Sequence, residues 1–206
     1  MSPPPRAFLI DYGSGNLHSA AKALAAVGLE PEVSADPDRA RNADLLVLPG
    51  QGHFGQVAGA LAASGFTEPV LAHLAAGKPF LGICVGLQLL FESSEEAPDV
   101  PGLGLLPGRV RRFPASALPV PHMGWNTLEP VGASPLTVGL SPLDRVYFVH
   151  SFYPEVWPDL AGATTAYGEV RFVSALSRDN LHATQFHPEK SGPVGLRILA
   201  NLLVAI

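Results

Sequence analysis

Phe80-Leu81-Gly82-Ile83-Cys84-Val85-Gly86 is an apolar stretch that contains the only cysteine of the chain, with a glycine two positions before it and another two positions after it. This pattern predicts a nucleophile elbow, in which a strand ends in a sharp turn and a helix begins. Small residues on both sides let the turn form without a clash against neighbouring backbone. The helix N-terminus favours a thiolate and leaves backbone N–H groups that can stabilise an oxyanion.

A second segment, Gln185-Phe186-His187-Pro188-Glu189, carries a histidine and a carboxylate two positions apart. Because proline disfavours helix at the residue before it, we expect residues 187–189 to be extended, with both side chains on the same side. His187 would be the general base, and Glu189 would orient and stabilise its imidazolium. A lone cysteine after an apolar run is more often a small buried hydrophobe, so the combination of the two segments carries the prediction of a catalytic triad.

The composition predicts one compact domain over residues 1–206, since 47% of the residues are hydrophobic and 15% are charged. A single cysteine cannot form an internal disulfide, which favours a cytoplasmic location. The formal net charge of −5 argues against a nonspecific nucleic-acid binder. We expect no membrane attachment, because the apolar stretch 79–91 is too short to span a bilayer and the first residues contain no secretory signal.

Strand-like and helix-like segments alternate along the first half of the chain. Strands are expected at 7–10, 32–35, 44–48 and 80–84, and helices at 17–27, 54–63 and 66–76. This alternation predicts an α/β fold with a mostly parallel central sheet flanked by helices. The reactive crevice of such a sheet lies beyond the carboxyl ends of its strands, where Cys84 would meet the loops 11–16 and 49–53.

The second half is expected to be richer in strands. Residues 98–142 contain many prolines and glycines and are expected to form a smaller β-rich insertion of turns and hairpins, not a second domain. Strands are expected at 108–113, 146–149, 163–167, 171–176 and 182–186. A last helix is expected at 193–204, with Ser191 or Gly192 as its N-cap.

The two reactive segments, together with Gln88, resemble those of class I (triad-type) glutamine amidotransferases, and the resemblance covers nearly the whole chain. Within this class, three further stretches are similar to the glutaminase subunits of imidazole glycerol phosphate synthase. They are Asp11-Tyr12-Gly13-Ser14-Gly15-Asn16-Leu17, Pro121-His122-Met123-Gly124-Trp125-Asn126 and Lys190-Ser191. The resemblance implies a flavodoxin-like fold and hydrolysis of L-glutamine to glutamate and ammonia.

The same resemblance implies a heterodimer with a (β/α)8-barrel cyclase subunit. Ammonia would pass through a tunnel to the cyclase, which would form imidazole glycerol phosphate and aminoimidazole carboxamide ribotide in histidine biosynthesis. The chain by itself would be a hydrolase, and the complete synthase a lyase.

The resemblance also implies residue roles. Cys84 attacks the glutamine amide and forms a glutamyl thioester, while His187 protonates the departing ammonia and then activates water. The oxyanion would be bound by the Val85 N–H and by the loop that carries Gln51 and Gly52, where Gln51 departs from the more usual valine. The residues that would contact glutamine are Gln88, Glu96 and Ser151. Those that would lie at the cyclase interface are Asn16, Trp125 and Lys190.

Without the resemblance, these residues have ordinary alternatives. Gln88 could be an exposed helix residue, Glu96 a solvated loop acid and Lys190 a surface lysine, while Trp125 could be a partly buried structural residue. His150 is expected to be a hydrogen-bonded core histidine. The other histidines lack the spacing of a metal cluster, so we expect neither a metal nor another cofactor.

Three alternative functions stay open. The chain could be the glutaminase subunit of another synthase, such as that for pyridoxal phosphate, although segment 121–126 argues against it. It could be an autonomous γ-glutamyl cysteine hydrolase that needs no partner. It could also be a pseudoenzyme, which the presence of Cys84, His187 and Glu189 makes the weakest of the three.

Overall fold

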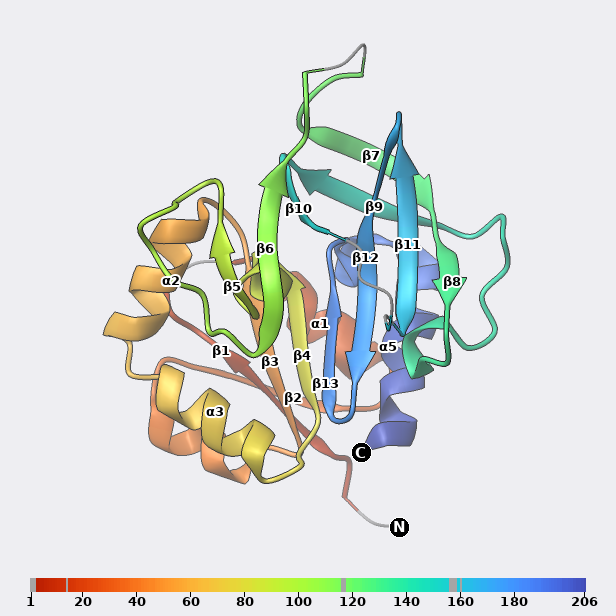
Figure 1. Ribbon diagram of the computed structural model, residues 1–206. Coiled ribbons are helices and arrows are strands. Elements are labelled where there is room, and N and C mark those ends of the chain that lie inside the picture. Colours follow the sequence, from red (N-terminus) through yellow and green to blue (C-terminus); the bar gives the residue numbers. More distant parts are fainter. Residues whose placement is uncertain (1–2, 14, 116–117, 156–158, 160) are drawn as a thin grey trace.

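The computed structural model describes residues 3–13, 15–115, 118–155, 159 and 161–206. Met1, Ser2 and Ser14, which belong to the amino-terminal segment and to the 11–16 loop considered above, lie outside the described residues. The centre of the described part is an eight-stranded sheet in the order β2-β1-β3-β4-β13-β12-β11-β8. Smaller sheets of three strands (β10-β6-β5) and two strands (β7-β9) lie beside it (Figure 1).

One half of the central sheet is parallel. It consists of β1 (Arg6–Ile10), β2 (Glu30–Ser34), β3 (Leu45–Gly50), β4 (Phe80–Cys84) and β13 (Leu181–Thr184). Every residue of β3 and β4 is buried, as expected for parallel strands that are covered on both faces. The strand order 2-1-3-4 is that of a doubly wound, flavodoxin-like sheet, which confirms the predicted fold class.

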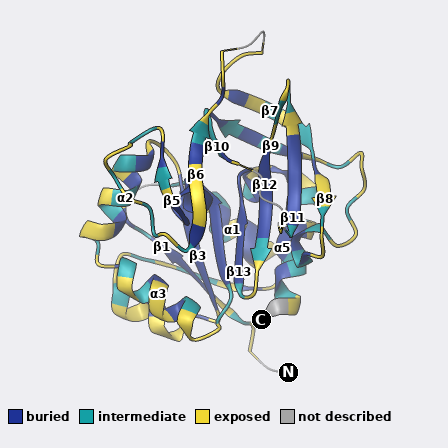
Figure 2. Ribbon diagram, in the orientation of Figure 1, coloured by how far each residue is buried: buried dark blue, intermediate teal, exposed yellow. Residues whose placement is uncertain are grey.

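Helices cover both faces of this sheet. The chain runs from β1 to the outer strand β2 through α1 (Leu17–Ala26), and in the opposite direction from β3 to β4 through α2 (Phe54–Ala63) and α3 (Thr67–Ala75). Right-handed crossovers therefore place α1 on one face and α2 and α3 on the other. The last helix, α5 (Gly192–Leu202), packs beside α1 behind the sheet in Figure 1. Figure 2 shows the buried strands between the partly exposed helices.

The other half of the sheet is antiparallel and contains β12 (Val170–Arg178), β11 (Gly162–Tyr167) and β8 (Glu129–Val131). The three-stranded sheet consists of β5 (Phe91–Ser94), β6 (Leu106–Arg112) and β10 (Phe152–Pro154), and the two-stranded sheet of β7 (His122–Thr127) and β9 (Arg145–His150). Short 3-10 turns form at Pro37–Asn42, Pro135–Thr137 and Leu203–Ala205.

The expected irregular insertion at 98–142 is more integrated than its composition indicated. β8 extends the central sheet, and β6 and β7 pair with β5, β9 and β10, which lie outside that range. Pairing between strands far apart in the chain leaves no local signal in a proline-rich sequence, so the composition revealed only the turns.

Two buried histidines join β7 to β9. His122 lies opposite His150 in the strand register, and its Nδ1 is 3.0 Å from His150 Nε2. His150 Nδ1 lies 2.9 Å from the carbonyl oxygen of Phe152, and the His122 ring stacks on Phe148. Burial lowers the pKa of His122 to about 4 and that of His150 to about 3, so both rings are neutral near pH 7. The expectation that His150 is a hydrogen-bonded core histidine is confirmed.

These rings should make the fold sensitive to acid, together with His182, whose pKa burial lowers to about 4. The unfolded state takes up protons as the pH falls through the ordinary value of 6.5, whereas the folded state does not until about pH 4. The stabilisation is therefore complete above pH 6.5 and is lost toward pH 4, at about 1 kcal/mol per pH unit for each histidine. Urea unfolding at a series of pH values between 7.5 and 5 would measure this slope.

His182→Gln should reduce the slope, while replacement of the exposed His18 by glutamine serves as the control and should leave it unchanged. A free energy of unfolding that stays constant between pH 6.5 and pH 5 would contradict the prediction.

Candidate active site

The turn at Cys84 depends on glycines that leave no room for a side chain. Cys84 ends β4 with φ +55° and ψ −108°, a backbone conformation that non-glycine residues rarely adopt. A Cβ atom on Gly82 would lie 2.8 Å from the Gly86 carbonyl oxygen, and one on Gly86 would lie 2.0 Å from the Leu48 carbonyl oxygen. The predicted elbow is confirmed, although the helix that follows, α4 (Val85–Gln88), is only a single turn.

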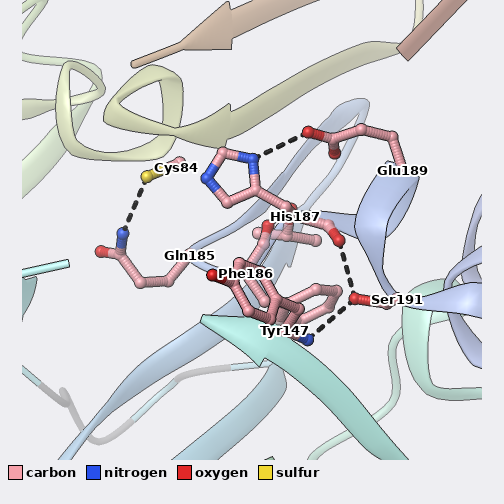
Figure 3. Close-up of polar contacts among 8 residues, drawn as sticks. Cys84, Tyr147, Gln185, Phe186, His187, Glu189 and Ser191 are labelled. Carbon is pink, nitrogen blue, oxygen red and sulfur yellow. Dashed lines mark hydrogen bonds and ion pairs between the residues drawn. The ribbon is translucent and has the colours of Figure 1, made fainter. Parts of the chain in front are cut away.

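Two neighbouring strands bring other site segments to Cys84. On one side, Gly50 of β3 is the register partner of Cys84, and it leads into the loop that contains Gln51. On the other side, Ile83 pairs with Thr184 of β13, so the next residue, Gln185, comes to lie beside Cys84. The side-chain nitrogen of Gln185 is 3.7 Å from the Cys84 sulfur (Figure 3).

His187 lies between Cys84 and Glu189 (Figure 3). Its Nδ1 is 2.8 Å from Glu189 Oε1, and the exposed fractions of the two side chains are only 4% and 3%. The prediction of an extended segment is correct for His187 alone, since Pro188–Lys190 forms a 3-10 turn. Proline suits the first position of such a turn, where its fixed φ is favourable and no N–H is needed. The turn folds Glu189 back toward the imidazole, so the two side chains still meet.

Ser191 holds the backbone of His187 in place. Its hydroxyl donates to the His187 carbonyl oxygen at 2.7 Å and accepts from the Tyr147 N–H at 3.0 Å. The His187 N–H donates to the Tyr147 carbonyl oxygen at 3.0 Å. Ser191 occupies the N-cap position of α5, as predicted, but its side chain caps no N–H of that helix and instead ties His187 to β9 (Figure 3).

The charge state of His187 follows from its neighbours. Burial lowers the pKa of His187, but its interactions with Cys84 and with the Glu189 carboxylate outweigh this effect and raise the pKa to about 10. The ring therefore carries a proton near pH 7. An imidazolium in this place can stabilise a neighbouring thiolate and later donate a proton to a leaving group.

A cavity of about 440 Å³ opens at Cys84. The predicted residues in its wall are Cys84, His187, Val85, Gln51, Gly52, Gln88, Glu96, Ser151 and Lys190. Glu189 lies behind His187, outside the cavity lining. Asn16, which precedes α1, and Trp125, on β7, do not line the cavity either.

Gln88 and Glu96 are held in defined positions. Gln88 is 3% exposed, and its side-chain nitrogen donates to the Phe152 carbonyl oxygen at 3.0 Å and to Gln185 Oε1 at 3.2 Å. The alternative of an exposed helix residue is therefore wrong. Glu96 Oε2 accepts from the Phe54 N–H at 2.7 Å at the start of α2, so Glu96 is not simply a solvated acid.

The end of β3, just before the loop with Gln51 and Gly52, is in contact with the loop after β1. The hydroxyl of Tyr12 donates to the Pro49 carbonyl oxygen at 2.5 Å, and a Cβ atom on Gly15 would lie 3.5 Å from the Pro49 side chain. Gly52 has a φ of +108°, which glycine adopts without strain. Tyr12 and Gly15, which precede Asn16, therefore contact the end of β3 that leads into the loop proposed to supply an oxyanion donor.

Strand β7 presents different residues to its two sides. Trp125 is 52% exposed and Met123 is 63% exposed, while His122 is buried. Trp125 is thus about half exposed and its ring packs on Tyr147, so the alternative of a partly buried structural tryptophan stays open. Two large apolar side chains on one exposed strand are unusual for a surface that faces only water.

Sequence reasoning gave no role to Gln185, Tyr12 or Ser191 in the site, although each makes a contact there. Gln185 lies beside Cys84 because it follows β13, which runs parallel to β4. The register of the two strands is not visible in the sequence, so this neighbour could not be predicted. Among the described residues there is no group of three or more His, Cys, Asp or Glu side chains that could hold a metal ion. In the same part of the chain, no helix is both long enough and apolar enough to cross a membrane.

Comparison with known proteins identifies the family. Residues 8–206 match the family "Glutamine amidotransferase class-I". The chain is 57% identical over 199 residues to the imidazole glycerol phosphate synthase subunit HisH of Deinococcus radiodurans, and the match covers 96% of this chain and 92% of the relative. The chain belongs to the HisH family of class I glutamine amidotransferases.

Two other matches concern a longer relative and the fold. A protein of Emericella nidulans named imidazole glycerol phosphate synthase hisHF is 45% identical to this HisH-family chain, over 97% of the chain and 38% of the larger protein. The crystal structure of a glutamine amidotransferase matches the fold with a TM-score of 0.75 and 18% sequence identity, covering 97% of this chain and 98% of the other. At that identity, the second match concerns the fold alone.

Gly86→Ala should disrupt the elbow, because the added Cβ atom would collide with the Leu48 backbone. We expect a loss of about 3 kcal/mol or more in the free energy of unfolding, and loss of glutaminase activity. Gly59→Ala is the matched control, since a Cβ atom there meets nothing within 4 Å in α2. It should stabilise the protein by about 0.5–1 kcal/mol. Denaturant unfolding of both variants measures the difference, and equal stabilities would be inconsistent with the steric argument.

Cys84→Ser should lower the pKa of His187 from about 10, because the interaction with the cysteine that helps to raise it is lost. Glu189→Gln should act in the same direction through loss of the carboxylate charge. We expect each change to lower the midpoint by about 1 to 3 pH units. An NMR titration of the imidazole nitrogens would measure it. If the imidazole midpoints of both variants equal that of the unchanged chain, Cys84 and Glu189 are not the groups that raise the pKa of His187.

Proposed function

We propose that Cys84, His187 and Glu189 hydrolyse L-glutamine in this HisH-family chain. The Cys84 thiolate attacks the side-chain amide carbon, and the tetrahedral adduct collapses to a glutamyl thioester as His187 protonates the departing ammonia. His187 then takes a proton from water, which attacks the thioester and releases glutamate and the free thiol. Glu189 keeps the imidazole oriented and stabilises its charged form.

The observation that carries this proposal is the buried imidazole between a carboxylate and the cysteine, at the wall of a cavity of about 440 Å³. A cysteine with only a packing role would need neither the strained backbone at Cys84 nor an ionised histidine beside it.

Other cavity residues support roles in binding glutamine. One Glu96 oxygen is bound by the Phe54 N–H, which orients the carboxylate and directs the other oxygen to the substrate α-ammonium group. The nitrogen of Gln88 is engaged by Phe152 and Gln185, so Gln88 would contact the substrate through its carbonyl oxygen. Ser151 would contribute through its backbone.

The developing oxyanion would be bound by backbone N–H groups. The Val85 N–H directly follows the nucleophile and is the first donor. Gln51 and Gly52 line the same cavity and would supply the second. Tyr12 contacts Pro49 at the end of β3, two residues before Gln51, so a partner bound near Asn16 could change the conformation of the loop that follows.

The partner of HisH subunits in imidazole glycerol phosphate synthase is the cyclase subunit, and the single-chain synthase of Emericella nidulans joins a HisH-like part to a longer chain. We propose that this chain forms a cytoplasmic heterodimer with such a cyclase and passes ammonia to it. The exposed Trp125 on β7, together with Asn16 and with Lys190 at the cavity rim, would contribute to the interface.

Glutamate release by the purified chain, with and without a cyclase subunit and its nucleotide ligand, tests the proposal. Cys84→Ala should reduce glutamine turnover about a thousandfold or more, while folding and binding of the cyclase are retained. The unchanged chain should be much more active with the loaded cyclase than alone.

Equal activity with and without the cyclase would instead favour an autonomous hydrolase. Loss of complex formation in the Cys84→Ala variant would indicate a structural cysteine.

A further inference from the structure

Gln185 occupies a buried position directly beside the nucleophile. It is fully buried, and its backbone N–H donates to the Ser174 carbonyl oxygen at 2.8 Å, which fixes the main chain there. Because Ile83 and Thr184 are register partners in parallel strands, the residue after Thr184 must lie alongside Cys84. Its side-chain nitrogen, 3.7 Å from the sulfur, is within the range of a hydrogen bond to sulfur.

The direction of the Gln185 amide is determined by its neighbours. An amide side chain can present either its oxygen or its nitrogen, and the surrounding partners decide which. The Phe152 carbonyl oxygen can only accept, so Gln88 must turn its nitrogen toward Phe152. The same nitrogen donates to Gln185 Oε1. Gln185 therefore has its oxygen toward Gln88 and its N–H groups toward the Cys84 sulfur.

The Phe152 carbonyl oxygen is also the end of a longer hydrogen-bonded network that begins on β7, in which His122 and His150 are buried and Asn126 is partly buried. Asn126 donates to the Ala166 carbonyl oxygen at 3.0 Å and, with the same nitrogen, lies 3.3 Å from His122 Nε2. His122 donates through Nδ1 to His150, and His150 donates through its own Nδ1 to Phe152. Each neutral ring has one donor and one acceptor, so main-chain carbonyl groups at both ends determine every direction between them.

We infer that Gln185 is a catalytic residue whose side-chain amide donates a hydrogen bond to the Cys84 sulfur and stabilises the thiolate, in an orientation imposed by Gln88 and the Phe152 carbonyl oxygen. The inference rests on the proposed role of Cys84 as nucleophile. This role explains why position 185 carries an amide. The side chain is fully buried, and an apolar side chain of similar volume would fill the same space. The Phe152 carbonyl oxygen accepts from both Gln88 and His150, so the histidine network of β7 and the groups beside the sulfur meet at this oxygen.

A hydrogen bond to the thiolate should be visible in the reactivity of the cysteine without any substrate. The rate of alkylation of the isolated chain by iodoacetamide, measured against pH, reports the thiolate population. The titratable groups that line the cavity with Cys84 are Glu96, Tyr147, His150, His187 and Lys190, and they are the same in each variant compared. Any change in the pH midpoint can then be assigned to the substituted residue.

Gln185→Met keeps the length of the side chain but removes the donor. We expect the alkylation midpoint to rise by about one pH unit, with alkylation roughly tenfold slower below the midpoint. Gln185→Glu should raise the midpoint at least as much, because a carboxylate beside the sulfur opposes the thiolate. Gln56→Met, at an exposed position of α2, is the matched control and should leave the profile unchanged.

A Gln185→Met variant that is folded, as shown by its circular dichroism and thermal transition, and that alkylates with the unchanged profile would overturn the inference. If this variant does not fold, the unchanged chain decides the question by NMR. The side-chain amide resonances of Gln185 should titrate with the alkylation midpoint, and this titration should be absent from Cys84→Ser. Amide resonances that do not respond to the thiol would also overturn the inference.

These readouts do not depend on glutamine turnover. A shifted alkylation profile in a chain without glutaminase activity would therefore support the role of Gln185 and count against the proposed function. An unchanged alkylation profile in the Gln185→Met variant of an active enzyme would count against the role of Gln185 and leave the proposed function intact.

Discussion

The close approach of three backbone segments around Cys84 is the constraint on which the site depends. The turn after β4 packs against β3 and against its own strand only because Gly50, Gly82 and Gly86 have no side chains; a Cβ atom at any of them would lie 2.0 to 2.8 Å from a backbone atom. This contact forces the positive φ of Cys84, a strain that the surrounding parallel strands can support because they are buried along their whole length. The sulfur thus has one position, and the loops after three strands converge on it.

Electrostatics then determine what the sulfur can do. His187 is buried, which by itself disfavours its charged form, yet Cys84 and Glu189 together raise its pKa to about 10. Burial makes each of these interactions stronger than it would be in water. The 3-10 turn at Pro188–Lys190 and the hydroxyl of Ser191 hold the imidazole between its two partners. Backbone geometry that sequence patterns did not predict therefore maintains the charge state on which the proposed hydrolysis depends.

A network of neutral groups complements these charges on the other side of the cysteine. The histidines at 122 and 150 stay uncharged because burial lowers their pKa values, and this neutrality lets them transmit a fixed hydrogen-bond direction from β7 to the Phe152 carbonyl oxygen. From the other side, Gln88 donates to the same oxygen and to Gln185, and Gln185 donates to the sulfur. β7 and the buried nucleophile thus lie at the two ends of one hydrogen-bonded structure, in which the Phe152 carbonyl oxygen is the shared acceptor.

The sequence by itself determined the fold class, the strands and helices of the parallel half, the elbow, and the pairing of His187 with Glu189. These are local properties: apolar periodicity, glycines at set distances from a cysteine, and two side chains only two residues apart. Resemblance to a family supplied the residues that line the cavity, which spacing alone could not have assembled. Only the tertiary structure decided that β6, β7 and β8 pair with distant strands, that residues 188–190 form a turn, and that Gln185 lies beside the sulfur. Each of these follows from strand register and from contacts between residues far apart in the chain, and neither has a local sequence signal.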